Sequence, residues 1–256
     1  MDVFQSIQET IKYAQKYGGR LTEKQLFERL IGDRVYKKKE IDQIIKLLNY
    51  KVVKLEEKNN ILEEKIEKAK RLAKKISRNF KDILFLGITG SVAAGYPKKN
   101  NDIDLIIITK INKLWLIRLK LRLFIMVNKI PHRKFGKKEK TDEFCFNLWL
   151  DEKSLELDKE KQHLKNAVDL ILMKPLINKN KTYEKFILAN DWAKKYIATG
   201  YSLKKPSPPI NRGTSLDREA LSERIINWLM FWLQFLYMKK KIKNEKVGLH
   251  KAFFHH

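Results

Sequence analysis

The stretch LGITGSVAAGYPKKNNDIDLIII, residues 86–108, places two aspartates inside an apolar run that would otherwise be an ordinary buried strand. Just before this interruption, the run ILFLGIT (83–89) carries no charge, which is the pattern of a buried strand. Between the two apolar runs lie a Gly90-Ser91 turn, the short segment SVAAG and a basic, polar loop. The segment therefore predicts a strand, a turn, a short helix and a second strand, in that order.

The two aspartates, Asp102 and Asp104, stand two residues apart at the start of the second strand. Because side chains alternate along a strand, both carboxylates lie on one face, while Ile103 and Leu105 point into the core. Two carboxylates on one rigid face suit Mg²⁺ ions that also hold a nucleoside triphosphate.

The turn before them adds a phosphate site. Gly90 has no Cβ, so a phosphate can approach its backbone closely. Ser91 contributes a hydroxyl, and SVAAG can open a helix whose first amides attract anions.

Thr-Gly-Ser, ten further residues and then Asp-Ile-Asp before an apolar run resembles the signature of the DNA polymerase beta-type nucleotidyltransferase superfamily. Thr89 departs slightly from the apolar residue usual before the glycine. The resemblance implies an α+β fold, in which helices flank a mixed sheet. It also implies transfer of a nucleoside monophosphate from a nucleoside triphosphate (NTP) to an acceptor, with release of pyrophosphate.

Carried over by position, the resemblance makes Gly90 and Ser91 the triphosphate-binding residues. It makes Asp102 and Asp104 catalytic ligands of Mg²⁺ or Mn²⁺.

The connecting loop adds Lys98 and Lys99, which could contact phosphates. As loop lysines in a lysine-rich chain, they suit a solvated position at least as well.

The family pattern usually has a third carboxylate on a neighbouring strand, and here that position holds Asn147, in EFCFNLWLDE (143–152). Alternation predicts one shared face for the odd-numbered residues Glu143, Cys145, Asn147, Trp149 and Asp151. An amide oxygen can ligate Mg²⁺, but it brings no negative charge and cannot act as a base. Glu143 and Asp151 each lie four residues from Asn147, about 13 Å along a strand. The site is then active with two aspartates, weakened, or kept only for binding.

Composition limits the cellular setting. The single cysteine, Cys145, excludes an intrachain disulfide framework and a cysteine-based zinc site. The N-terminus has no signal-peptide pattern, so we expect a cytoplasmic protein. The apolar runs 114–127 and 225–238 carry charged or polar residues and are shorter than the roughly 20 apolar residues that span a bilayer. Both predict core helices and no membrane partner, with a membrane-surface helix as the alternative for the second.

The net charge of +25 permits a nucleic-acid partner, RNA or DNA, bound through a basic surface. The alternative is that most of these lysines only solvate the surface, because surface charge does not identify a partner.

We predict three domains. Residues 1–62 resemble a winged helix, with three helices followed by a hairpin that turns at Lys58-Asn59-Asn60. Within them, Thr22 is the expected N-cap, with Gln25 at the capping-box spacing. The second domain, 63–155, is the nucleotidyltransferase core, and the third, 156–256, is a helical C-terminal domain. A winged helix can read a DNA groove, but it is equally a scaffold for protein contacts or substrate positioning.

Two functions follow. The first is a metal-dependent nucleotidyltransferase whose acceptor is a nucleic acid, a small molecule or a protein, with nucleic acid slightly favoured by the charge. The second is a non-catalytic nucleic-acid-binding or regulatory protein with a degenerate core, which Asn147 favours. The sequence leaves open the NTP, the acceptor and the oligomeric state.

Overall fold

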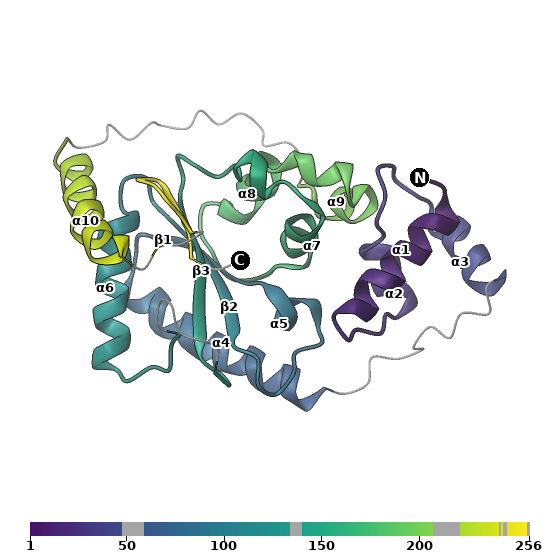
Figure 1. Ribbon diagram of the computed structural model, residues 1–256, viewed down its shortest axis with the longest axis horizontal. Helices are drawn as coiled ribbons and strands as arrows, with labels where there is room; N and C mark the ends of the chain where they lie inside the picture. The colour runs from purple at the N-terminus through teal and green to yellow at the C-terminus, as the bar shows by residue number, and fades with distance from the viewer. Residues whose placement is uncertain (48–58, 134–139, 207–220, 241, 243–244, 255–256) are drawn as a thin grey trace.

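A mixed six-stranded sheet forms the centre of the molecule, with strand order β4-β1-β2-β3-β6-β5 (Figure 1). The computed structural model describes residues 1–47, 59–133, 140–206, 221–240, 242 and 245–254. The pair β2 and β3 is parallel, and the other neighbouring strands are antiparallel. The strands are β1 (Ile83–Ile88), β2 (Ile103–Thr109), β3 (Phe144–Asp151), β4 (Lys174–Asn178), β5 (Lys246–Val247) and β6 (Lys251–Phe253).

Helices cover both faces of this sheet, which confirms the predicted α+β class. The α-helices are α1 (Val3–Lys16), α2 (Glu23–Glu28), α3 (Lys38–Leu47), α4 (Asn60–Asn79), α5 (Gly90–Ala94), α6 (Leu114–Val127), α7 (Leu164–Leu172), α8 (Thr182–Ala189), α9 (Ala198–Lys204) and α10 (Leu221–Lys239). Two 3₁₀ turns, η1 (Lys159–Lys161) and η2 (Asp191–Lys195), complete the described elements.

Alternation along β2 divides the core into two layers. Ile103, Leu105 and Ile107 point to the layer that α4, α6 and α10 cover. Ile106 and Ile108 point to the opposite layer, which α7, α8 and η2 cover. Asp102 and Asp104 are even-numbered, like Ile106 and Ile108, and so belong to the same face of the strand. Strand alternation thus directs both carboxylates toward α7.

The helix predicted for residues 114–127 is confirmed as α6. Its Arg118 is buried, where it donates to the Gln234 side chain of α10 at 2.6 Å and lies over the Phe254 ring at 4.3 Å. Lys113 precedes the helix, and Asn112 has a φ of 55°.

The N-terminal unit, α1 to α3, has its own small core. Thr22 caps α2 and forms the predicted capping box with Gln25. Backbone hydrogen bonds join the unit to the C-terminal region: Gly32 N–H donates to the Tyr196 carbonyl at 2.7 Å, and Ala198 N–H donates to the Gly32 carbonyl at 2.9 Å. These two bonds fix the unit against α9.

The predicted hairpin of the winged helix is wrong in its second arm. The Asn59 side chain accepts the Leu62 N–H and starts α4 at Asn60, so residues 60–64 are helical. An asparagine at a turn is also a good N-cap, and the long amphipathic repeat that follows extends the helix back to it. The first arm lies within 48–58, outside the described residues. The winged-helix assignment and the domain boundaries stay predictions.

The region after residue 156 was predicted to be helical, and this is wrong for three strands, β4, β5 and β6. They have two to five residues, too few to show a strand period in the sequence. β4 lies at the edge of the sheet, where Pro175 can be accommodated without a backbone donor. Within the described part of the chain, no helix is long and apolar enough to cross a membrane.

Buried Lys65 ties α4 to the loop that leads into β2. Its Nζ donates to the Asn101 carbonyl at 2.6 Å, to Asp142 Oδ1 at 2.9 Å and to the Lys99 carbonyl at 3.3 Å. The side chain is 2% exposed. The ammonium therefore joins three chain segments next to Asp102.

Replacing Lys65 by methionine should destabilise the protein by about 1–3 kcal/mol, because two carbonyls and one carboxylate oxygen lose their donor. Lys70→Met, which removes an exposed pair with Glu67, should cost less than about 1 kcal/mol. Urea unfolding of both variants tests this, and equal losses would contradict the anchoring role.

Candidate active site

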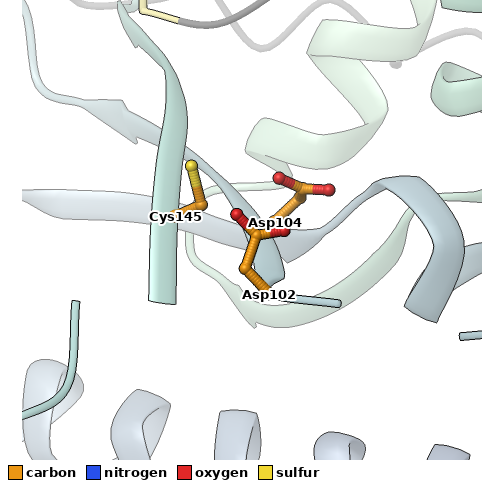
Figure 2. Close-up of side chains that lie close together, drawn as sticks. All are labelled: Asp102, Asp104 and Cys145. Carbon is orange, nitrogen blue, oxygen red and sulfur yellow. The ribbon is translucent and has the colours of Figure 1, made fainter. Parts of the chain in front are cut away.

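The carboxylates of Asp102 and Asp104 meet beside the first residues of β3. Ligand atoms of Asp102, Asp104 and Cys145 all lie within 4.8 Å of one another, and Figure 2 shows the three side chains converging. Asp102 is 3% exposed, and Asp104 is half-buried. The structure thus brings the two predicted metal ligands together.

Position 90 must be a glycine because the Asp104 carboxylate occupies the space that a Cβ would fill. Gly90 has a φ of 64°, and a Cβ there would collide with Asp104 Oδ2 and lie 3.3 Å from Cγ. Its N–H is held by the carboxylate of Asp169 on α7. The sequence predicted that the missing Cβ leaves room for a phosphate, whereas in the structure the Asp104 carboxylate occupies that space.

Electrostatics in this pair disfavours two negative charges. Burial, followed by the negative charge of Asp102, raises the pKa of Asp104 to about 7. Burial also raises the pKa of Asp169 to about 6.

Arg133 offsets part of the negative charge. Its Nη1 lies 3.1 Å from Asp102 Oδ2. Arg133 belongs to the basic stretch PHRKFGKKEK (131–140), of which residues 134–139 lie outside the described residues.

Asn147 reaches Asp104 through a β-bulge. Leu105 pairs with Phe146 while Ile106 pairs with Leu148, so Asn147 is the extra residue. Its Nδ2 donates to Asp104 Oδ1, and its Oδ1 accepts the Cys145 thiol at 2.8 Å.

The bulge also reverses the alternation of β3. Phe146 and Trp149 pack in the same core layer, with ring centroids 6.1 Å apart. The prediction that the odd-numbered residues of this strand share one face is therefore wrong after Asn147, because Trp149 lies on the face of Phe146.

The two alternative carboxylates on this strand do not replace Asn147. Asp151 is fully buried at the far end of β3, where it accepts the Asn112 N–H at 3.1 Å and lies 2.7 Å from His250 Nδ1. Glu143 precedes β3 and does not line the cavity described next.

A cavity of about 880 Å³ opens over the aspartate pair. Among its described lining residues are Gly90, Ser91 and Lys98, but not Lys99. The Ser91 hydroxyl donates to Asn101 Oδ1 at 3.4 Å, and the same oxygen accepts the Lys98 N–H at 2.8 Å. Asn101 thus holds the serine and the loop together at the rim.

Sequence reasoning missed several lining residues because they come from distant segments. Asp169, Lys161 and Lys165 come from α7 and the turn before it. Tyr13 and Lys16 of α1, and Tyr17 directly after it, come from the far end of the chain. Their local patterns are those of ordinary amphipathic helices, so no local signal marked them.

The donor set fits a divalent ion that arrives with a phosphate ligand. Mg²⁺ is typically held by one or two carboxylates together with substrate phosphates, and Asp102 and Asp104 supply the carboxylates. Cys145 does not fit as a third ligand for Mg²⁺, because this hard cation prefers oxygen ligands to sulfur. Asn147 offers an amide in place of a third carboxylate.

Residues 69–192 match the family model of the nucleotidyltransferase domain. This part of the chain is similar to that domain, and the match supports the nucleotidyltransferase superfamily. It contains the Gly90 turn, both aspartates and Asn147, whereas α1–α3 and the segment after η2 lie outside the match. The predicted resemblance is confirmed, and the domain supports general nucleotide transfer from an NTP substrate. No curated protein and no solved structure matches the chain.

Replacing Gly90 by alanine should disrupt the nucleotidyltransferase site, because the new Cβ displaces the Asp104 carboxylate. We expect a loss of divalent-ion affinity of at least about 10-fold, as for the loss of groups that orient metal ligands. Titration with Mn²⁺ measures it.

Gly95→Ala is the matched control. Gly95 also has a positive φ, of 93°, but a Cβ there meets nothing within 4 Å. A similar loss in both variants would mean that backbone strain, not the contact with Asp104, is responsible.

The raised pKa of Asp104 predicts a pH-dependent stability in metal-free protein. An aspartate titrates near 3.8 in the unfolded chain and at about 7 here, so the native state holds the extra proton between these values. The free energy of unfolding should therefore fall as pH rises through this window. Asp169, whose pKa is raised to about 6, also lowers the free energy of unfolding as pH rises from about 4 to 6.

Urea unfolding in chelator across pH 4–8 measures this dependence, and Asp104→Asn should flatten it above about pH 6. An unchanged slope in that variant would show that Asp104 does not titrate in this range.

Proposed function

We propose that the protein is a divalent-metal-dependent nucleotidyltransferase that moves a nucleoside monophosphate from an NTP to an acceptor and releases pyrophosphate. The observation that carries this proposal is the Asp102–Asp104 pair, packed against Gly90 inside a large cavity. Asp102 directly precedes β2 and Asp104 is its second residue, so the sheet sets the spacing of the pair.

Each residue has a role that its position supports. Asp102 and Asp104 hold the ion, Mg²⁺ or Mn²⁺, which when bound neutralises charge on the phosphates and the leaving pyrophosphate. Ser91 donates to a phosphate oxygen, and Lys98 lies on the rim where its ammonium can pair with the triphosphate. Asp169 keeps the Gly90 N–H occupied and so fixes the turn.

Asn147 acts by orienting Asp104. Its amide donates a hydrogen bond to the carboxylate but cannot remove a proton from the acceptor. We propose that the site works with two carboxylate ligands. The rival, a binding protein with a degenerate core, rests on this same residue.

The acceptor we favour is a nucleic acid, because the chain carries a net charge of +25 and polyphosphates attract such surfaces. Lysines supply most of the charge, so such binding would be electrostatic and mostly independent of sequence. We also propose a cytoplasmic location, where the single thiol stays reduced.

The proposal predicts that Asp104→Asn and Asp102→Asn each lower Mg²⁺-dependent NTP binding and transfer by at least about 100-fold, because removal of a direct ligand should exceed the 10–100-fold effect of its neighbours. Each labelled NTP is incubated with Mg²⁺ or Mn²⁺ and cellular RNA, and the labelled product is measured. Asp191→Asn removes an exposed carboxylate and is the control.

Measurements on Asn147→Asp together with the parent protein separate the two proposed functions. In a working enzyme, a third carboxylate should strengthen divalent-ion binding and preserve or raise transfer. If the parent protein binds no NTP and transfers nothing with any acceptor, while it still binds RNA, the binding-protein alternative is correct.

A further inference from the structure

The N-terminal unit forms one wall of the nucleotidyltransferase cavity. The family match begins at residue 69, yet Tyr13, Lys16 and Tyr17 of the N-terminal unit line the same cavity as Asp102 and Asp104. Figure 1 shows α1 and α2 beside α5 and α7, the elements that carry the Gly90 turn and Asp169.

This wall is rigidly attached. The backbone pairing of Gly32 with Tyr196 and Ala198 is reinforced by the buried Thr199 hydroxyl, which accepts the Tyr36 N–H at 3.1 Å. On the cavity side, Arg29 Nη1 donates to the Ala94 carbonyl, at the end of α5, at 2.8 Å.

Close packing continues at the cavity edge. The Tyr96 ring lies against Gly19, where a Cβ would come within 2.6 Å of it. Arg29 also lies near that ring, 6.0 Å from its centroid.

The tyrosines on this wall are not part of the unit's own core. Ile7, Ile11 and Ala14 supply the core face of α1. Tyr13, Lys16 and Tyr17 stand at the i, i+3 and i+4 spacing, which places them together on another face. Tyr17 is 40% exposed, and its ring lies 5.1 Å from that of Tyr13.

The chemistry of this face suits a nucleotide. Aromatic rings stack on nucleobases of any sequence, and an adjacent lysine can pair with a phosphate. Lys16 Nζ lies 5.7 Å from the Tyr17 ring centroid, so ring and ammonium are adjacent. A tyrosine hydroxyl is neutral near pH 7, and burial raises the pKa of Tyr13 further, so this group can donate a hydrogen bond.

We propose that Tyr13, Lys16 and Tyr17 form a nucleoside-phosphate subsite of the cavity, in which a base stacks on Tyr17 and Lys16 binds its phosphate. The inference rests on the proposed function. Its ligand is either the NTP itself or the terminal nucleotide of a nucleic-acid acceptor, since both present the same base and phosphate.

Tyr17→Ala and Lys16→Ala in the full-length protein test the subsite. The probes are Mg²⁺–ATP and a short single-stranded RNA, each measured by equilibrium binding. Loss of one stacked base predicts about 5- to 150-fold weaker binding for Tyr17→Ala. Tyr17→Phe keeps the ring and should bind like the parent.

Matched controls lie on the same helix. Phe4→Ala removes an aromatic side chain that is 39% exposed, and Lys12→Ala removes a lysine whose side chain is 81% exposed; neither residue lines the cavity.

The two probes identify the source of the nucleotide. A loss confined to Mg²⁺–ATP means that the NTP occupies the subsite, and a loss confined to RNA means that the acceptor does. If Tyr17→Ala binds both probes like Phe4→Ala, the subsite is disproved while the proposed function stands. If the parent protein shows no metal-dependent binding of ATP, CTP, GTP or UTP, the proposed function fails instead.

Discussion

Two carboxylates that lie within 4.8 Å of each other in a half-buried cavity repel, and much of the local structure follows from holding them there. Strand β2 fixes their spacing. Gly90 has no Cβ, which leaves room for the Asp104 carboxylate. Arg133 pairs with Asp102, and the bulge in β3 brings the Asn147 amide into hydrogen-bond contact with Asp104. Burial, followed by the repulsion that remains from Asp102, raises the pKa of Asp104, and a divalent cation would relieve that repulsion.

Support for the pair extends well beyond the residues that touch it. Lys65, on α4, holds the carbonyls of the loop that precedes Asp102, and Asp169, on α7, holds the Gly90 N–H. These helices lie on opposite faces of the sheet. The turn and the loop are therefore fixed from both sides, so a ligand meets a site that is already formed.

The sequence predicted the parts of the site that depend on near neighbours in the chain. The spacing of Gly90, Asp102 and Asp104 predicted the strand, turn and second strand, because alternation is a local rule. Asn147 was also found, since the family pattern places a residue there. The capping box of Thr22 and Gln25 was predicted for the same local reason.

What the sequence did not predict depends on long-range contacts. The bulge in β3 arises from its pairing with β2, and alternation alone gives Trp149 the wrong face. Strand β4 is too short to show a period. The local sequence gives Asp169 and Tyr17 only the pattern of ordinary helix residues, and tertiary packing brings them to the cavity.

Charge by itself does not explain how such a cavity would recognise an NTP. Its described lining includes basic residues, such as Lys98, Lys161 and Lys165, but also the carboxylates of Asp102 and Asp104. A free triphosphate would be repelled by those carboxylates at close range, so its reactive end can approach them only together with a cation. The lysines attract any polyanion equally. Selectivity for a nucleotide must therefore come from groups that recognise a base, and among the described lining residues Tyr17, at the end of α1, offers an exposed aromatic ring for that purpose.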